Sequence, residues 1–315
     1  MRIDTHHHAI PPVWRAALER AGADKSGGAP LPDWSVDRAL AALDGAGVDA
    51  AVLSISEPGV FHGDVPAAVE LARRCNDAVA AIVAEHPRRF GALAVLPLPD
   101  VDASLAELER VAAEPAFDGV VLLANYDGRY LGDQAFDPVF DELNRRDATV
   151  FVHPSTPPGP GAGLPPFLID FTFDTTRAIA KLIVSGTAER CPAINFVMAH
   201  AGGAAPYLAQ RMEQVGQRLP REPMPAGPRA YLQRFHYDTA LSAGPEALAA
   251  LQALVGPDRI LFGSDWPYVP DEAVSETAEA ALTLLPEPAR AAAMSGNALR
   301  LFPKLAGRLT GGDGG

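Results

Sequence analysis

Short apolar runs recur along the chain, and most are followed by a segment in which apolar residues return every three or four positions. Eight of them have the length and composition of β-strands: RID before His6, AAVLSI (50–55), ALAVL (92–96), GVVLLA (119–124), TVFVH (149–153), NFVMAH (195–200), FHYDTA (235–240) and ILFGSD (260–265). The middle runs are almost continuously apolar, which is typical of parallel strands that are buried on both faces.

The segments between these runs have helical periodicity. SVDRALAALDGAG has Ser35 placed as an N-cap, and VPAAVELARRCNDAVAAIVAEHP continues until Pro87. Strand followed by helix, repeated eight times, predicts an α/β fold of the (β/α)8 TIM barrel type. The alternative, a doubly wound open sheet, lacks a glycine-rich phosphate-binding turn after its first strand. We expect residues 1–306 to form this single domain and 307–315 to be a flexible tail.

Two connections are longer than usual. They cover residues 21–34 and 154–168, and the second one, PSTPPGPGAGLPPFL, directly follows the fifth predicted strand. A long proline-rich loop at that place would lie over the mouth of the barrel. We expect it to act as a lid or as a pocket wall.

The composition of the chain argues against some classes of binding partner. The net charge of −13 argues against a nucleic-acid groove or an anionic membrane surface. The apolar runs are too short to span a bilayer, and the chain has no basic start followed by a long apolar stretch. Cys75 and Cys191 form no disulfide framework, so we expect reduced thiols and a cytoplasmic protein.

Polar residues stand at the ends of four predicted strands, where barrels of this type carry their chemistry. They are His6 and His8, then His153, His200 and Asp265. Side chains alternate along a strand, so His6 and His8 share one face while His7 points away. A lone histidine at a strand end is more often structural, but four converging ends predict a metal site. The other histidines, His7, His62, His86 and His236, are expected to be ordinary structural residues.

The residue types predict one divalent ion. A binuclear barrel needs a bridging carboxylate or a carboxylated lysine, and Lys25, Lys181 and Lys304 all lie away from the strand ends. Three imidazoles and a carboxylate suit zinc with an open coordination position, and manganese is the alternative.

Several motifs together resemble the amidohydrolase superfamily. IDTHHH, VFVHP, FDTTRAIAKLIVSG, NFVMAHAGG and ILFGSDWPY resemble its decarboxylase branch, which includes aminocarboxymuconate semialdehyde decarboxylase and 6-methylsalicylate decarboxylase. The resemblance runs from His6 to about Pro267, and FDTTRA and YDTALS are closest to the 6-methylsalicylate type. It implies a metal-dependent, non-oxidative decarboxylase of an aromatic, salicylate-like carboxylic acid. It also implies a homodimer or a larger homo-oligomer.

The resemblance assigns roles residue by residue. His6, His8, His153 and Asp265 match the metal ligands. His200 matches the histidine that handles the proton beside the metal. From the chemistry of the reaction, His200 and Asp265 are the candidates for carrying the proton. Arg211 matches a recurring arginine, for which we expect contact with the substrate.

One departure from the aminocarboxymuconate enzymes concerns the substrate. Ala39 stands where those enzymes have an arginine that grips a second carboxylate, and Arg38 is one position away. This departure favours a substrate with a single carboxylate on an aromatic ring.

The remaining candidates concern the ring pocket and the reaction. Aromatic residues expected at the mouth are Tyr126, Phe167, Phe171, Trp266 and Tyr268, while Arg177 is a candidate anchor for an anionic group or a surface contact. Ring protonation followed by loss of CO₂ is the expected course. The main alternative is hydrolysis of a lactone or amide by metal-activated water. A third possibility is a non-catalytic barrel that binds a metal or a partner protein.

Overall fold

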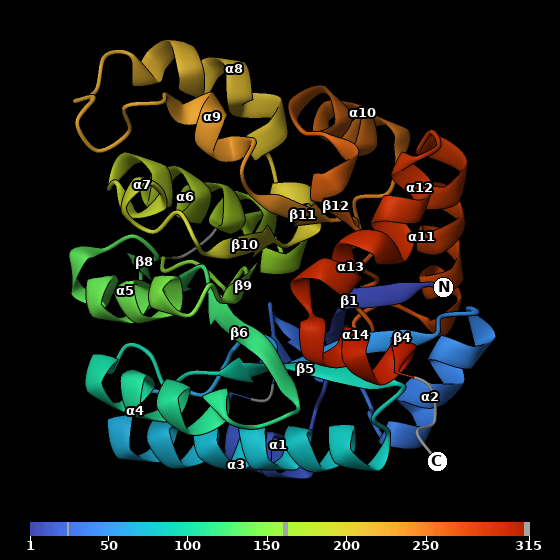
Figure 1. The fold of residues 1–315 in the computed structure, drawn as a ribbon. Coiled ribbons are helices and arrows are strands. Elements are labelled where there is room, and N and C mark those ends of the chain that lie inside the picture. The colour runs from blue at the N-terminus through green and yellow to red at the C-terminus, as the bar shows by residue number, and fades with distance from the viewer. Residues whose placement is uncertain (24, 160–162, 312–315) are drawn as a thin grey trace.

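Eight parallel strands form the centre of the molecule in the computed structural model, which describes residues 1–23, 25–159 and 163–311 (Figure 1). Their order is β1 (Ile3–His8), β4 (Ala50–Ser54), β5 (Phe90–Val95), β6 (Phe117–Leu123), β9 (Thr149–His153), β10 (Asn195–Met198), β11 (His236–Asp238) and β12 (Ile260–Leu261). The backbone N–H of Thr5 donates to the carbonyl of Phe262 (2.9 Å), so β1 closes onto the β12 segment. The predicted barrel is confirmed.

Helices surround this barrel (Figure 1). They are α1 (Pro12–Ala21), α2 (Val36–Gly45), α3 (Val65–Glu85), α4 (Val101–Ala112), α5 (Asp137–Arg145), α6 (Asp170–Val184), α7 (Thr187–Arg190), α8 (Ala205–Gly216), α9 (Pro228–Leu232), α10 (Pro245–Leu254), α11 (Asp271–Leu284), α12 (Ala289–Ala291), α13 (Asn297–Leu301) and α14 (Pro303–Thr310). The expected N-cap is present, because Ser35 Oγ accepts from Arg38 N (3.2 Å). The last helix continues through Thr310, four residues into the segment for which the sequence predicts a flexible tail.

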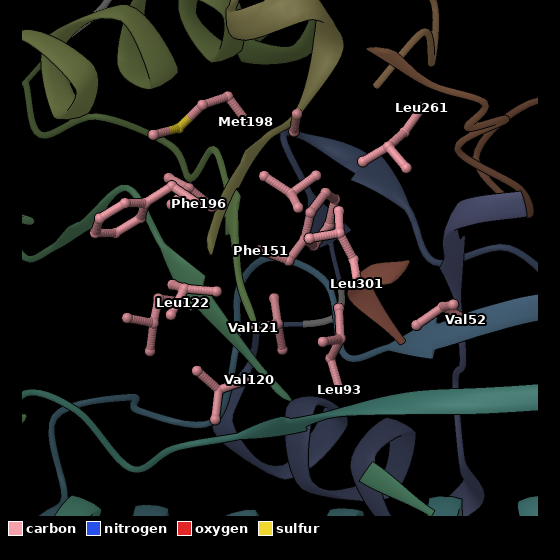
Figure 2. Packing of buried hydrophobic residues seen from close by; sticks show 14 of the residues in the cluster. Val52, Leu93, Val120, Val121, Leu122, Phe151, Phe196, Met198, Leu261 and Leu301 are labelled. Carbon is pink, nitrogen blue, oxygen red and sulfur yellow. The ribbon is translucent and has the colours of Figure 1, made fainter. Parts of the chain in front are cut away.

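The strands are apolar on both faces because each face meets a different part of the core. On β9, Phe151 shares the inward face with His153, and its ring lies 4.8 Å from that of His6. Val152 is fully buried on the opposite face, toward the helices. Figure 2 shows Phe151 among the other packed apolar side chains of the core. The barrel interior is therefore filled below the histidines, which leaves the strand ends as the place for a site.

The two long connections meet over the mouth of the barrel. The first contains a hairpin of β2 (Lys25–Ser26) and β3 (Ala29–Pro30), and the second ends in the short helix η2 (Pro166–Leu168). Glu57 joins them: its carboxylate accepts from Gly27 N (2.7 Å) and from Thr156 Oγ1 (2.7 Å). Gly27 has a φ of +56°, and a Cβ there would lie 2.7 Å from the ring of Phe171.

Neither cysteine forms a disulfide, and both are buried. Burial raises the pKa of the Cys75 thiol to about 12, so it stays protonated at neutral pH. Within the described residues, we find no helix with the length and apolar character needed to cross a membrane.

Candidate metal centre

Side chains from four strand ends meet at one end of the barrel. His6, His153, His200 and Asp265 each offer one ligand atom, and these atoms all lie within 4.8 Å of one another. His8 joins them, because its Nε2 lies 3.0 Å from His6 Nε2 and 3.1 Å from Asp265 Oδ1. All five side chains are buried. The set matches the strand-end residues singled out from the sequence.

Strand β1 places two histidines inward and one outward, as alternation requires. The rings of His6 and His8 lie 4.9 Å apart at the cluster. The ring of His7 instead stacks on Trp266 at 4.8 Å, and its Nδ1 donates to Asp4 Oδ2 (2.9 Å). Asp4 also accepts from the backbone N–H and the hydroxyl of Ser264, which ties β1 to the segment that carries Asp265.

Three of the histidines have the outer ring nitrogen engaged. His6 Nδ1 lies 2.8 Å from Asp238 Oδ2, His153 Nδ1 lies 2.8 Å from the carbonyl of Pro154, and His8 Nδ1 lies 3.0 Å from Ser54 Oγ. A carboxylate or a carbonyl only accepts, so the Nδ1 of His6 and of His153 carries a hydrogen and the Nε2 of each faces the cluster. The Ser54 hydroxyl can donate or accept, so it holds the ring of His8 in place without fixing its tautomer. Metal-ligating histidines are held in this way. The donor set therefore fits a divalent cation.

His200 is held differently. It opens the short helix η3 (His200–Gly202) with a φ of +55°, and its backbone N–H donates to Asp238 Oδ1 (2.9 Å). Its Nε2 lies 3.4 Å from Asp265 Oδ2, while its Nδ1 is buried without a hydrogen-bond partner among the described residues. The turn needs Gly202, since a Cβ there would lie 2.6 Å from the ring of Tyr237.

The electrostatics of the cluster favour positive charge at its centre. Burial alone would lower the pKa of His6, but Asp238 and Asp265 outweigh it and raise that pKa to about 10. Burial acts to raise the pKa of Asp265, yet His6 and the hydrogen bonds from His200 and His8 hold it well below its usual range. Burial also lowers the pKa of His153 well below that of a free imidazole. The buried carboxylates thus provide the charge that a cation needs.

A cavity of about 270 Å³ opens at the cluster, with His153, His200 and Asp265 in its lining. The rest of the lining consists of five apolar residues (Ala29, Phe167, Leu168, Phe171 and Leu241) and five that carry a hydroxyl (Ser26, Ser56, Thr172, Ser242 and Tyr268). Phe167 and Leu168 come from the connection that the sequence predicts to act as a lid or pocket wall. Small-molecule sites have this combination of an apolar wall and a few convergent polar groups.

Three of the predicted pocket aromatics line this cavity, namely Phe167, Phe171 and Tyr268. Tyr126 instead lines a neighbouring cavity of about 390 Å³, and its hydroxyl accepts from Leu123 N (3.1 Å). Trp266 is packed against His7 and donates from Nε1 to Asp271 (2.8 Å). The structure does not bring these two rings into the metal cavity.

The two predicted arginines also lie outside the cavity lining. Arg177 is exposed on α6 and faces a surface depression beside Arg129 and Tyr130. Arg211 is exposed on α8. Helix α6 turns Phe171 and Thr172 toward the cavity, and Arg177 lies more than one turn further along and on another face.

Sequence reasoning missed the residues that hold the ligands. Asp238 and Ser54 contact the rings of His6 and His8, and Asp4 accepts from the backbone N–H of His6. All three are fully or almost fully buried. The available signal was an acid at the end of an apolar run, as in FHYDTA, because an acid is rarely buried unless it is paired.

Several known proteins are similar to this chain in sequence or in structure. The family described as Amidohydrolase matches residues 3–304. The 6-methylsalicylic acid decarboxylase of Penicillium expansum is 37% identical over 98% of this chain and 98% of its own length. A crystal structure of 2,6-dihydroxybenzoate decarboxylase with 2,6-dihydroxybenzoate bound has a TM-score of 0.83 at 27% identity, covering 96% of this chain and 99% of that one. The 5-carboxyvanillate decarboxylase of Novosphingobium aromaticivorans, complexed with manganese and 4-hydroxy-3-methoxy-5-nitrobenzoic acid, has a TM-score of 0.86 at 26% identity, covering 96% of both chains.

Proposed function

Because this chain belongs to the amidohydrolase family and is a carboxy-lyase that decarboxylates an aromatic acid, we propose that its substrate is a salicylate-like acid with one carboxylate. The observation that carries the proposal is the apolar cavity that ends on the histidine and aspartate cluster. The relatives named are decarboxylases, so hydrolysis of a lactone or amide gains no support from them.

We propose His6, His8, His153 and Asp265 as ligands of a single divalent ion. The engaged Nδ1 atoms of the three histidines support this assignment, since each contact holds the ring with its Nε2 toward the cluster. Three imidazoles favour zinc, whereas the similar 5-carboxyvanillate decarboxylase is complexed with manganese. When bound, such an ion supplies a positive centre for the carboxylate and for an ortho oxygen of the ring.

His200 and Asp265 are the residues we propose to move the proton. The Nε2 of His200 lies 3.4 Å from Asp265 Oδ2, and both side chains line the cavity. The proton forms a new C–H bond at the ring carbon that bears the carboxylate. The C–C bond to the carboxylate then breaks, its electron pair returns to the ring, and CO₂ leaves.

The cavity wall suits an aromatic ring with few charged substituents. Phe167, Leu168 and Phe171 supply apolar surface, and Ser56 and Tyr268 add side chains whose buried hydroxyls have no hydrogen-bond partner among the described residues. Ala39, at the place of the second-carboxylate arginine, is buried in the core. Arg38 Nη1 donates to Asp33 Oδ2 (3.3 Å), and Arg38 lies outside the cavity lining. These contacts support a substrate with one carboxylate. A role in substrate binding gains no support from the cavity lining for four of the predicted residues, Arg177, Arg211, Tyr126 and Trp266.

We also propose a cytoplasmic homodimer or larger homo-oligomer. The free, buried thiols of Cys75 and Cys191 are consistent with a reducing compartment. Leu168 (58%) and Leu241 (65%) line the cavity and are exposed, and a second copy would cover such surface.

Solvent deuterium incorporation tests the reaction. Enzyme and an ortho-hydroxybenzoate are incubated in deuterated water, and the product is followed by mass and proton spectra. We expect CO₂ release with one deuterium at the carbon that held the carboxylate, because the incoming proton derives from solvent. Inert hydroxybenzoates together with turnover of lactones or amides would replace the decarboxylase with a metal-dependent hydrolase.

A further inference from the structure

One peptide group, between Pro154 and Ser155, joins a buried carboxylate to His153. His153 Nδ1 donates to the carbonyl of Pro154 (2.8 Å), and the N–H of Ser155 donates to Asp174 Oδ2 (2.9 Å). The carbonyl and the N–H belong to the same rigid plane and point in opposite directions. A carboxylate that fixes the N–H therefore also fixes the carbonyl that orients the imidazole.

Asp174 is built into this position. It is fully buried on α6, and the side-chain amide of Asn125 donates to both of its oxygens (3.0 Å each). The hydroxyl of Ser155 donates to the carbonyl of Asn125 (3.1 Å), which closes the arrangement. The Ser155 N–H and the Asn125 amide both donate to Asp174, and this is the pattern of an ionised carboxylate that only accepts.

We propose that Asp174 is a positioning residue that holds His153 for metal binding through the Pro154–Ser155 peptide; this inference rests on the proposed function, in which His153 is a ligand. The negative charge beside the Ser155 N–H polarises the peptide and strengthens the hydrogen bond that the Pro154 carbonyl accepts. The lone pair on His153 Nε2 becomes both better aimed and more basic. His6 receives the same support by direct contact with Asp238.

The inference gives a role to two sequence segments. Asp174 lies in FDTTRA and Asp238 lies in YDTALS, so each segment contributes a buried acid that orients one histidine. It also accounts for Arg177, whose positive charge acts against the rise that burial causes in the pKa of Asp174. Arg177 thus supports the charge of Asp174 from the surface.

The chain contains a matched control. Glu107 on α4 is a buried acid that accepts from the side-chain amide of Asn76 (2.6 Å) and pairs with Arg110, three residues further on (2.7 Å). Asp174 likewise has an asparagine donor, Asn125, and an arginine three residues further on, Arg177. The two acids differ by one methylene group. Glu107 has no hydrogen bond to the histidine cluster among the described residues. The change in thermal midpoint of a Glu107→Gln variant therefore measures the effect on stability of removing a buried charge that does not contact the histidines.

The experiment compares Asp174→Asn, Glu107→Gln and His153→Ala with the unchanged protein. Each metal-free protein is titrated with Co²⁺ against a chelating dye, and the visible d–d spectrum and thermal midpoint are recorded. We expect Asp174→Asn to weaken Co²⁺ affinity by about 10- to 100-fold and to change the spectrum. Glu107→Gln should lower only the thermal midpoint.

The outcomes separate the two hypotheses. If His153→Ala binds Co²⁺ as tightly as the unchanged protein, the proposed ligand set is wrong. If His153→Ala weakens binding but Asp174→Asn behaves like Glu107→Gln, the positioning role is wrong. Should Asp174→Asn not fold, Ser155→Pro and Ser155→Ala decide, because proline removes the N–H and alanine keeps it. Equal Co²⁺ affinity in these two variants overturns the proposal.

Discussion

His153 and His200 follow neighbouring strands and line the same cavity, yet the chain holds them in different ways. His153 ends a regular strand, and its Nδ1 is committed to the carbonyl of Pro154 (2.8 Å). His200 stands in a left-handed turn beyond β10, and its Nδ1 has no partner among the described residues. An imidazole with one committed nitrogen presents a fixed lone pair, whereas one with an uncommitted nitrogen is suited to exchange a proton.

The histidines of this cluster therefore fall into two groups, according to whether Nδ1 has a hydrogen-bond partner among the described residues. His6 and His8 fall with His153, because Asp238 and Ser54 engage them. His200 stands apart although its Nε2 lies close enough to Asp265 to share a metal. Variants of the two kinds should therefore fail in different measurements.

Removing an anchored histidine should have the largest effect. His6→Ala takes away one proposed ligand and leaves Asp238 without the imidazole that it holds, so we expect metal content and turnover to fall together. Elemental analysis and CO₂ release on the same preparation measure both. The control is His236→Ala, which removes a buried histidine whose Nε2 contacts Arg259 and not a residue of the cluster. A His6→Ala protein with normal metal content would contradict the sorting.

The unanchored histidine should give a smaller and more selective loss. His200→Asn should keep most of the metal and lose about 10²- to 10⁴-fold in turnover, the usual contribution of a general acid or base. Metal content and kcat on the same sample separate the two effects. A metal-free His200→Asn protein would make His200 a ligand and remove the contrast with His153.

Much of this arrangement was predictable from the sequence, for one physical reason. Side chains alternate along a strand, so HHH at the end of a predicted strand predicts two histidines inward and His7 outward. Parallel strands bring their carboxyl ends to one face, so His153, His200 and Asp265 were expected to meet His6 and His8. Neither argument needs any knowledge of loops.

The parts that were not predictable depend on loops and on helix rotation. Tyr126 follows β6 directly, but the β7–β8 hairpin (Asn125–Tyr126 and Arg129–Tyr130) turns it into the neighbouring cavity. Trp266 directly follows Asp265, but the Asp265 side chain lies in the histidine cluster while the Trp266 ring stacks on His7. The support from Asp174 depends on a contact between residues 19 positions apart, which no local pattern encodes.

The smallest effect on the site is expected at His7, the third histidine of the same strand. His7→Ala removes a ring that stacks on Trp266 and donates to Asp4, both on the far side of β1 from the cluster. Asp4 keeps its bonds from Ser264, so the segment that carries Asp265 stays tied to β1. We expect a stability loss of about 1–3 kcal/mol from the lost packing and hydrogen bond, with metal content and kcat close to normal. Chemical denaturation and elemental analysis measure the two quantities. Loss of metal at wild-type stability would show that β1 faces the other way and that the sorting of its histidines is wrong.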